Sequence, residues 1–246
     1  AISRSLRSIS GQLYEHWHLD VLSSQPAPQL SSSRLTWHTI APDQASALTA
    51  KLIVQSGEAW HTLINGGDCL TEDALLFAAQ QLLDAPQTAL LLTDGDSVGQ
   101  DGTLSRPWLA PGMNPDWIRS CLYVGGLVIG ATRTMLTALE DIGASPTNAL
   151  PIAALLRALE EHAPAAPCHI SRISLHRTET HQPIPLEFRA DLLQAHLARC
   201  GRSAQLEHGL LDDTCHIKYD HDGVQPSIAI LIRELTYRDA MLRSVE

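Results

Sequence analysis

The stretch that decides the fold is Ala89-Leu90-Leu91-Leu92-Thr93-Asp94-Gly95-Asp96, in which apolar residues run into two carboxylates separated by a glycine. A short apolar run ended by turn-forming Asp and Gly predicts a buried parallel strand with its acids at the C-terminal end. Ligands of open α/β sheets bind at that edge, where an Asp-x-Asp pair could hold a divalent cation against a diphosphate. The alternative interpretation is that Asp94 and Asp96 only end the strand and turn the chain into a loop.

Apolar and amphipathic segments alternate along most of the chain. Strands are expected at residues 18–22, 35–38, 60–64, 122–129 and 169–176, in addition to the stretch above. Helices are expected at residues 4–10, 45–55, 71–83, 134–142, 150–161 and 186–200, and Thr71 is expected to be an N-cap. Residues 95–115 are rich in Gly and Pro and predict a long loop. This order predicts an α/β fold with a mostly parallel central sheet and helices on both faces.

Composition excludes several classes of function. A formal net charge of −10 argues against a nucleic-acid binder, whose surface carries a basic patch. The sequence shows neither an apolar window long enough for a transmembrane segment nor a signal peptide. The five cysteines form no Cys-x-x-Cys pair, which argues against a structural zinc or redox motif and favours a reducing, cytoplasmic setting. Peripheral attachment to the inner membrane is left open.

The end of the chain predicts a change of domain. Residues 216–219 are a strand candidate, and a polar hinge at 220–223 separates them from the apolar run Ser227–Ile232 and a helix at 237–245. Within that expected helix, the sequence Leu242-Arg243-Ser244-Val245 is similar to Leu6-Arg7-Ser8-Ile9 near the start of the chain. We therefore expect one domain over 1–215, and over 216–246 a linker with the first strand-helix unit of a related domain. Alternatively, Ser227–Ile232 fills a sheet position left vacant before Ala1, in its own chain or in a neighbour.

Several motifs along the chain carry a family likeness. They are Leu6-Arg7-Ser8-Ile9 with Gln12, Tyr14 and Trp17; Asp73-Ala74-Leu75; Thr93-Asp94-Gly95-Asp96 with Asp101-Gly102; Tyr123-Val124-Gly125; His169-Ile170-Ser171-Arg172-Ile173 with His176; and Pro226 to Val245 as the opening of a second copy. With these motifs the chain resembles family 2 glycosyltransferases of the GT-A fold, especially tandem-domain forms that build bacterial surface polysaccharides.

The resemblance implies a Rossmann-like nucleotide-diphospho-sugar transferase fold that lacks its first strand. It implies transfer of a sugar from a nucleotide-sugar donor to a saccharide or lipid-linked acceptor, with Mg²⁺ or Mn²⁺ as cofactor. It also implies a second glycosyltransferase domain as a partner. Asp68, Asp94 and Asp96 are then the candidates for holding the metal and the nucleotide sugar, and His176 lies where the family often places a further metal ligand.

This sequence departs from the family pattern at three acidic positions. Ser23-Ser24 replaces the carboxylate that holds the nucleotide, and Asn65-Gly66-Gly67 replaces most of the metal-binding Asp-x-Asp, with only Asp68 kept. Pro151 and Ala153 fall where the resemblance expects the carboxylate base. No catalytic residue is therefore assigned, and whether the chain is an enzyme is left open.

Two hypotheses remain from the sequence. The first is a glycosyltransferase that uses Asp68, Asp94 and Asp96 around Mg²⁺ or Mn²⁺, with His176 nearby. The second is a catalytically degenerate GT-A module that supports a partner domain or binds glycan without chemistry. A dinucleotide-binding protein is a weak third interpretation, because no Gly-x-Gly-x-x-Gly follows a strand. Gly125-Gly126 is instead expected to allow close packing.

Overall fold

The computed structural model describes most of the chain, in segments separated by short gaps. The described residues are 2–28, 32–122, 124–143, 147–162, 165–179, 184–212, 214–220, 223 and 227–231. The helices are α1 (Ile2–Ser10), α2 (Ala45–Ser56), α3 (Ala74–Asp84), α4 (Pro115–Cys121), α5 (Thr132–Ile142), α6 (Leu150–Ala158) and α7 (Leu186–Arg199). The strands are β1 (Leu19–Ser23), β2 (Leu35–Thr39), β3 (Trp60–Thr62), β4 (Cys69–Leu70), β5 (Leu90–Val98), β6 (Leu104–Trp108), β7 (Val128–Ala131), β8 (Cys168–Thr178), β9 (Ala204–His208) and β10 (Cys215–Tyr219).

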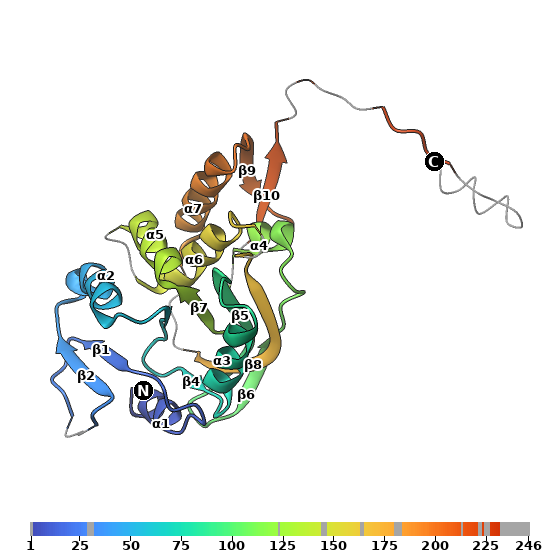
Figure 1. Cartoon of the computed structure of the whole chain (residues 1–246). Helices are drawn as coiled ribbons and strands as arrows, with labels where there is room; N and C mark the ends of the chain where they lie inside the picture. Colours follow the sequence, from blue (N-terminus) through green and yellow to red (C-terminus); the bar gives the residue numbers. More distant parts are fainter. Residues whose placement is uncertain are drawn as a thin grey trace, which may run out of the picture.

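The main sheet is mixed. Its strand order is β3-β7-β5-β8-β4, with β6 paired to β5, and Figure 1 shows β5 and β8 running through its centre. Only the β5–β8 pair of this sheet is parallel, and its other pairs are antiparallel. The α/β class is confirmed, but the expectation of a mostly parallel sheet is wrong. The reason is that β6 and α4, rather than one crossover helix, connect β5 to β7, so the chain has reversed direction when β7 begins.

Two smaller sheets accompany the main one. Strands β1 and β2 form a parallel pair, and β9 and β10 form an antiparallel pair. The boundary expected after residue 215 falls at the start of β10, which pairs with β9 rather than with residues further along the chain. Among residues 227–231, which belong to the apolar run expected as a strand, the structure has no strand.

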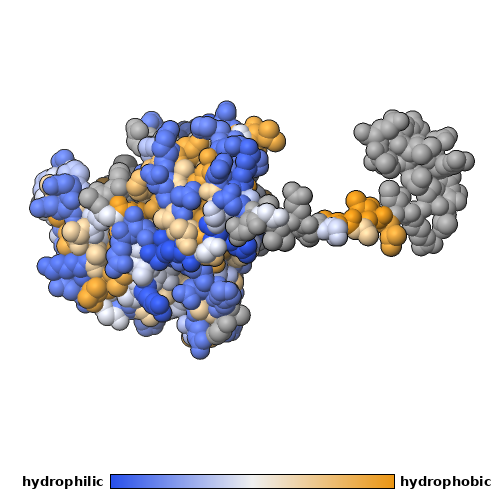
Figure 2. Space-filling model, turned by 90° about the horizontal axis from the view of Figure 1, so that it is seen from above, coloured by the Kyte–Doolittle hydropathy of each residue, from blue (hydrophilic) through white to orange (hydrophobic). Residues whose placement is uncertain are grey.

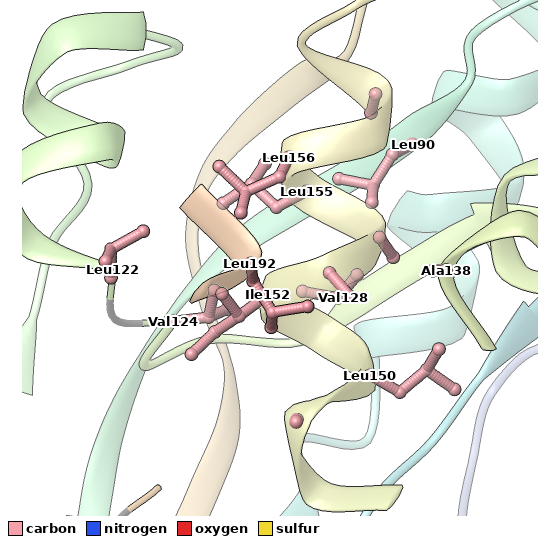
Figure 3. Close-up of a cluster of buried hydrophobic side chains, with 14 of the residues drawn as sticks. Leu90, Leu122, Val124, Val128, Ala138, Leu150, Ile152, Leu155, Leu156 and Leu192 are labelled. Carbon is pink, nitrogen blue, oxygen red and sulfur yellow. The ribbon is translucent and has the colours of Figure 1, made fainter. Parts of the chain in front are cut away.

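Helices cover both faces of the main sheet, as expected. Strand β5 shows why, because its side chains alternate between two hydrophobic clusters. Leu90 and Leu92 pack with residues of α5, α6 and α7, whereas Leu91 packs with residues of α1 and α3. Figure 3 shows Leu90 facing Leu155 and Leu156 of α6 in the first cluster. A strand buried on both faces reads as a continuous apolar run, which is what made this stretch recognisable.

The predicted N-cap at Thr71 is wrong. Helix α3 begins at Ala74 with Asp73 at the N-cap position, and the Thr71 hydroxyl donates a hydrogen bond to Asp73 Oδ1 (2.8 Å). Arg172 reaches the same carboxylate from β8 and lies over the ring of Phe77. These contacts pull the Asp73 pKa below its usual range, with the Thr71 hydrogen bond the largest cause. The start of α3 is thereby tied to β8.

Candidate functional site

Asp94 and Asp96 lie inside a strand. Strand β5 continues to Val98 and then turns back through β6, so the predicted loop after the acids contains a hairpin strand. The expectation that these acids stand at a C-terminal strand end is therefore wrong. Asp94 is 5% exposed and Asp96 is 8% exposed. A buried carboxylate must be hydrogen-bonded or paired, so the partners of each decide what it can do.

Asp94 is held by two donors from other parts of the chain. His169 Nε2 on β8 lies 2.8 Å from Asp94 Oδ1, and the backbone N–H of Ala110 donates to the same oxygen at 2.9 Å. Both side chains of the Asp94–His169 pair are 7% exposed. Because a carboxylate only accepts, the imidazole N–H is the donor. Asp94 therefore joins β5, β8 and the segment after β6.

Asp96 and Asp68 flank one histidine across the sheet. His176 Nδ1 lies 2.5 Å from Asp96 Oδ1, and His176 stands opposite Asp96 on one side and Cys69 on the other. Asp68, 1% exposed, immediately precedes Cys69. Its two carboxylate oxygens accept the backbone N–H groups of Asn65 (3.2 Å) and Thr178 (2.9 Å). The structure thus places Asp96 on β5, His176 on β8 and Asp68 just before β4, the strand that pairs with β8.

Glycines let another segment cross β5 beside its acids. A Cβ on Gly95 would lie 2.2 Å from the carbonyl oxygen of Gly125, and one on Gly126 would lie 1.7 Å from that of Thr93. The Thr93 hydroxyl accepts the backbone N–H of Leu127 at 3.0 Å. The expectation that Gly125-Gly126 serves close packing is confirmed. This crossing lies against β5 at Thr93 and Gly95, the residues that alternate with its two carboxylates.

The donor set does not fit a resident metal ion in this arrangement. Within the described ranges, no group of three or more His, Cys, Asp or Glu side chains is placed to hold one. Asp68 accepts backbone N–H groups, and Asp94 and Asp96 each accept from an imidazole. A divalent cation needs such oxygens turned toward a shared centre. Binding of Mg²⁺ or Mn²⁺ by this chain stays a prediction.

The positions expected to have lost acids are ordered and uncharged. Ser23 ends β1, and the segment 65–67 follows β3, where the Gly67 N–H donates to the buried Ser5 hydroxyl (2.8 Å). Pro151 occupies the first turn of α6, and Ala153 is buried in the core. The chain therefore places no carboxylate of its own at any of these positions except Asp68.

Comparison with known proteins gives one curated relative and a set of structural neighbours. No family model matches the chain. The O-antigen biosynthesis protein RfbC of Myxococcus xanthus is 28% identical over 142 residues, which is 53% of this chain and 11% of that protein. The Staphylococcus aureus TarS structure (residues 1–349) in complex with UDP superposes with a TM-score of 0.54 at 12% identity, covering 80% of this chain and 61% of that one. The TarS complex with UDP-GlcNAc gives 0.54 at 12% identity, covering 80% and 62%.

In sequence the chain is similar to a part of RfbC, and in fold it is similar to TarS. The TarS likeness, at 12% identity, shows the fold alone, and O-antigen biosynthesis is the role that the name of RfbC gives to that relative. The matched region is about a tenth of the relative, so the relative's overall activity does not transfer with the match. No helix in the described part of the chain has the length and apolar character to cross a membrane.

A hollow in the described part of the chain lies away from the buried acids. It has a volume of about 410 Å³ and is lined by His18, Asp20, Leu52, Gln55, Ser56 and Glu58. These residues come from β1 and the residue before it, the last turns of α2, and the residue two before β3. None of the candidates Asp68, Asp94, Asp96 and His176 lines it. The hollow and the acids are therefore separate features.

Sequence reasoning did not single out His169 as a partner of Asp94. His169 and His176 are seven residues apart, which on a regular strand puts their side chains on opposite faces. The β5–β8 register shifts twice, so the three steps from Thr93 to Asp96 face the six from Ile170 to His176. The irregularity lets both histidines meet acids that share one face of β5. A bulge leaves no reliable trace in residue spacing.

Proposed function

We propose that this chain is a glycosyltransferase-like module without transfer chemistry of its own, retained as a structural support for a catalytic partner domain in surface-polysaccharide synthesis. The observation that carries the proposal is the internal use of its buried acids. Asp94 and Asp96 are hydrogen-bonded to His169 and His176, and Asp68 accepts two backbone N–H groups. Acids engaged in this way stabilise the sheet.

The chemistry of sugar transfer supports the same proposal. A leaving diphosphate needs positive charge beside it, and an acceptor hydroxyl needs a base. Removing one group that stabilises developing charge commonly lowers the rate by about 10²-fold or more. The neutral residues at Ser23-Ser24, at Asn65-Gly66-Gly67 and at Pro151 with Ala153 would remove several such groups together.

The second candidate is an active glycosyltransferase. It would transfer a sugar from a nucleotide-sugar donor to a saccharide or lipid-linked acceptor, with Mg²⁺ or Mn²⁺ near Asp68, Asp94, Asp96 and His176. The observation that favours it is the placement of His176 on β8 between Asp96 on β5 and Asp68 just before β4. The UDP and UDP-GlcNAc complexes of TarS add support for a nucleotide-sugar ligand.

Calorimetry on the 246-residue chain separates the two candidates. UDP-, GDP- and dTDP-sugars are titrated with and without Mn²⁺, and a thermal melt of the same sample checks that it is folded. We expect no binding heat in any titration. Micromolar binding that requires Mn²⁺ would support the active transferase and contradict the module, provided that Asp96→Asn removes the binding and Asp101→Asn, in the exposed turn after β5, preserves it.

A further inference from the structure

The chain contains three asparagines, and one of them, Asn65, is followed by a glycine. An asparagine side chain loses ammonia when the backbone nitrogen of the next residue attacks the carbonyl carbon of its amide. Glycine favours this attack, because it has no Cβ that would block the approach of its nitrogen. Asparagine is accordingly among the residues that limit the chemical lifetime of proteins at high temperature. The pair Asn65-Gly66 is therefore a candidate modification site.

The structure leaves room for this reaction at Gly66. Gly66 is exposed, and nothing lies within 4 Å of the position that a Cβ would take there. The N–H of Gly67 donates to the buried Ser5 hydroxyl (2.8 Å), whereas the N–H of Gly66 has no acceptor among the described residues. The nitrogen of Gly66 is therefore free to act as the nucleophile.

The backbone of Asn65 lies in a tight turn closed by Asp68. The Asn65 N–H donates to Asp68 Oδ2 (3.2 Å), and the Asn65 carbonyl accepts the Asp68 N–H (3.0 Å). Both bonds use backbone atoms of Asn65, so they leave its side-chain amide uncommitted. Asn65 is partly exposed, and residues 63–65 belong to no helix or strand. Water therefore reaches the amide, and ring closure breaks no strand pairing.

The other two asparagines are protected against the same reaction. Asn114 precedes Pro115, which has no N–H. The side-chain oxygen of Asn114 also accepts two backbone N–H groups at the start of α4 (3.1 and 3.0 Å). Asn148 lies in the short 3-10 helix Thr147–Ala149, and the following Ala149 is 1% exposed. Neither site gives a backbone nitrogen free access to the amide.

Two Asp-Gly pairs in the described part of the chain could form the same ring, with loss of water instead of ammonia. At Asp94-Gly95 the backbone is closely covered, since a Cβ on Gly95 would lie 2.2 Å from a carbonyl oxygen. Asp101, before Gly102, accepts the N–H (2.9 Å) and the hydroxyl (2.7 Å) of Thr103. These bonds lower the Asp101 pKa, the backbone bond being the largest cause, and an ionised carboxylate resists the attack. Asn65 is thus the open site.

We propose that Asn65 is a site of spontaneous deamidation in the folded protein, with water as the co-reactant. The Gly66 nitrogen gives its proton to the solvent and forms a bond to Asn65 Cγ, while the Cγ–Nδ2 bond breaks and Nδ2 leaves as ammonia. Water then opens the cyclic imide at either carbonyl, which gives an aspartyl or an isoaspartyl residue. One water is consumed and one ammonia is released. The proposal is independent of whether the chain transfers sugars.

Both products alter the surroundings of Asp68. The aspartyl form adds a negative charge to the turn that Asp68 closes, and like charges at short range repel. The isoaspartyl form inserts a methylene group into the backbone, which changes the spacing of the two hydrogen bonds to Asp68. Asp68 also accepts the N–H of Thr178 on β8 (2.9 Å), so the change reaches the main sheet. We expect both forms to melt at a lower temperature than the unmodified chain.

Ageing of the purified 246-residue chain tests the proposal. The folded protein is kept in mildly alkaline and in mildly acidic buffer, and peptide mass spectrometry follows the conversion of amide to carboxylic acid at each asparagine. We expect conversion at Asn65 in the alkaline buffer, with both products present. Asn114 and Asn148 are internal controls and should stay intact. Anion exchange should resolve the aged fraction as a more acidic form.

Two variants assign the conversion to this turn. Gly66→Ala hinders the attacking nitrogen, while its methyl group meets nothing within 4 Å in the fold. We expect this variant to melt like the wild type and to lose the conversion at Asn65. Asn65→Asp reproduces one product directly, so it should co-elute with the aspartyl fraction of the aged wild type and share its melting temperature.

The ageing must take place in folded, dispersed protein. Figure 2 shows apolar residues of the run 227–231 outside the body of the molecule, and such exposed residues favour association. Dilute samples are therefore aged, and light scattering and circular dichroism check their dispersion and their fold.

Three results would overturn the proposal. The first is an intact Asn65 in the folded chain under conditions in which a peptide of residues 62–69 is converted. The second is conversion that begins only after urea has unfolded the chain. The third is conversion in Gly66→Ala at the rate of the wild type, because the nitrogen of Gly66 is then not the nucleophile.

Discussion

At the scale of single residues, the main sheet depends on positions where an added side-chain atom has no room. Gly126 is the sharpest case, because its Cα passes the backbone of Thr93 where a side chain would overlap the carbonyl oxygen. Asp94 and Asp96, which pair with His169 and His176, lie on the same stretch of β5. A single substitution at such a position is therefore expected to change the stability of the whole sheet.

We predict that Gly126→Ala destabilises the protein by roughly 3 kcal/mol or more, because the backbone of β5 or of the crossing segment must move to admit the methyl group. Urea denaturation followed by circular dichroism measures the change. Gly66→Ala is the matched control, since nothing lies within 4 Å of a Cβ at that position. Equal stability of the two variants would contradict the close approach.

We predict that stability falls as the pH drops below about 6.5, the ordinary pKa of a histidine. Burial lowers the pKa of His196, whose Nε2 accepts from Arg119 (3.2 Å) and whose Nδ1 donates to Glu160 (3.0 Å). The folded state therefore binds this proton less readily than the unfolded state, and acid favours unfolding. Urea midpoints between pH 5 and pH 8 measure the slope.

The same measurement on two variants shows which histidine causes the pH dependence of stability. His196→Gln should flatten it, whereas His162→Gln on the exposed surface should leave it unchanged. Burial also lowers the pKa of His61, so a part of the slope remains in the His196 variant. A slope that is identical in all three proteins would show that His196 does not contribute.

At the scale of secondary-structure elements, one side chain connects α1 to α3. Gln12 is buried, its Nε2 donates to the carbonyls of Ser8 (3.1 Å) and Thr71 (2.6 Å), and its Oε1 accepts the N–H of Leu75 (3.0 Å). We predict that Gln12→Ala costs about 2 kcal/mol, since buried backbone groups lose their partners. Thermal unfolding measures the loss. Gln87→Ala, in an exposed turn, should unfold like the wild type.

The sequence predicted those helices and strands whose own residues carry a clear apolar pattern. Strand β5 and the helices α2, α5, α6 and α7 were placed within a few residues, because an apolar run or stripe marks each of them. Strands β4, β6 and β9 were missed. Such short or exposed strands form because a neighbouring strand offers a free edge for pairing. Their position is therefore set by the neighbouring strand and cannot be predicted from their own residues.

The candidate site divides in the same way. The likeness to a family singled out Asp68, Asp94, Asp96 and His176. In the structure, Asp96 lies on β5, His176 on β8 and Asp68 just before β4. What the sequence did not predict is their engagement with His169, Ala110 and Thr178, which are distant in the chain. The register shifts between β5 and β8 bring His169 to Asp94, and such shifts leave no local pattern in the sequence.

At the scale of the whole molecule, an ion-pair network joins the helices of one face. Arg157 of α6 makes two hydrogen bonds to Asp141 of α5 (2.6 and 2.7 Å), and Arg199 of α7 reaches both Asp141 and Glu160. These groups are partly buried, so their attraction is screened less than that of surface pairs. Helices α5, α6 and α7 therefore pack as one layer over β5.

The parallel pair β1–β2 stands outside that layer and outside the main sheet. We predict that its amides exchange with deuterium well before those of β5 and β8, because little buried surface opposes its local opening. Mass spectrometry of peptic peptides after a short labelling pulse measures the order. Equal protection of residues 19–23 and 90–98 at low protein concentration would contradict this.

The β1–β2 pair, called here the β1–β2 corner, can open locally while the core around β5 stays folded. If the β1–β2 corner opens, the apolar faces of Leu19 and Trp60 meet water while the helical layer over β5 stays intact. Chaperones and proteases recognise such partly opened forms, and the unpaired backbone of this corner could recruit unrelated extended chains. The lifetime of the protein in a cell would then be decided at this corner, rather than by the stability of the core.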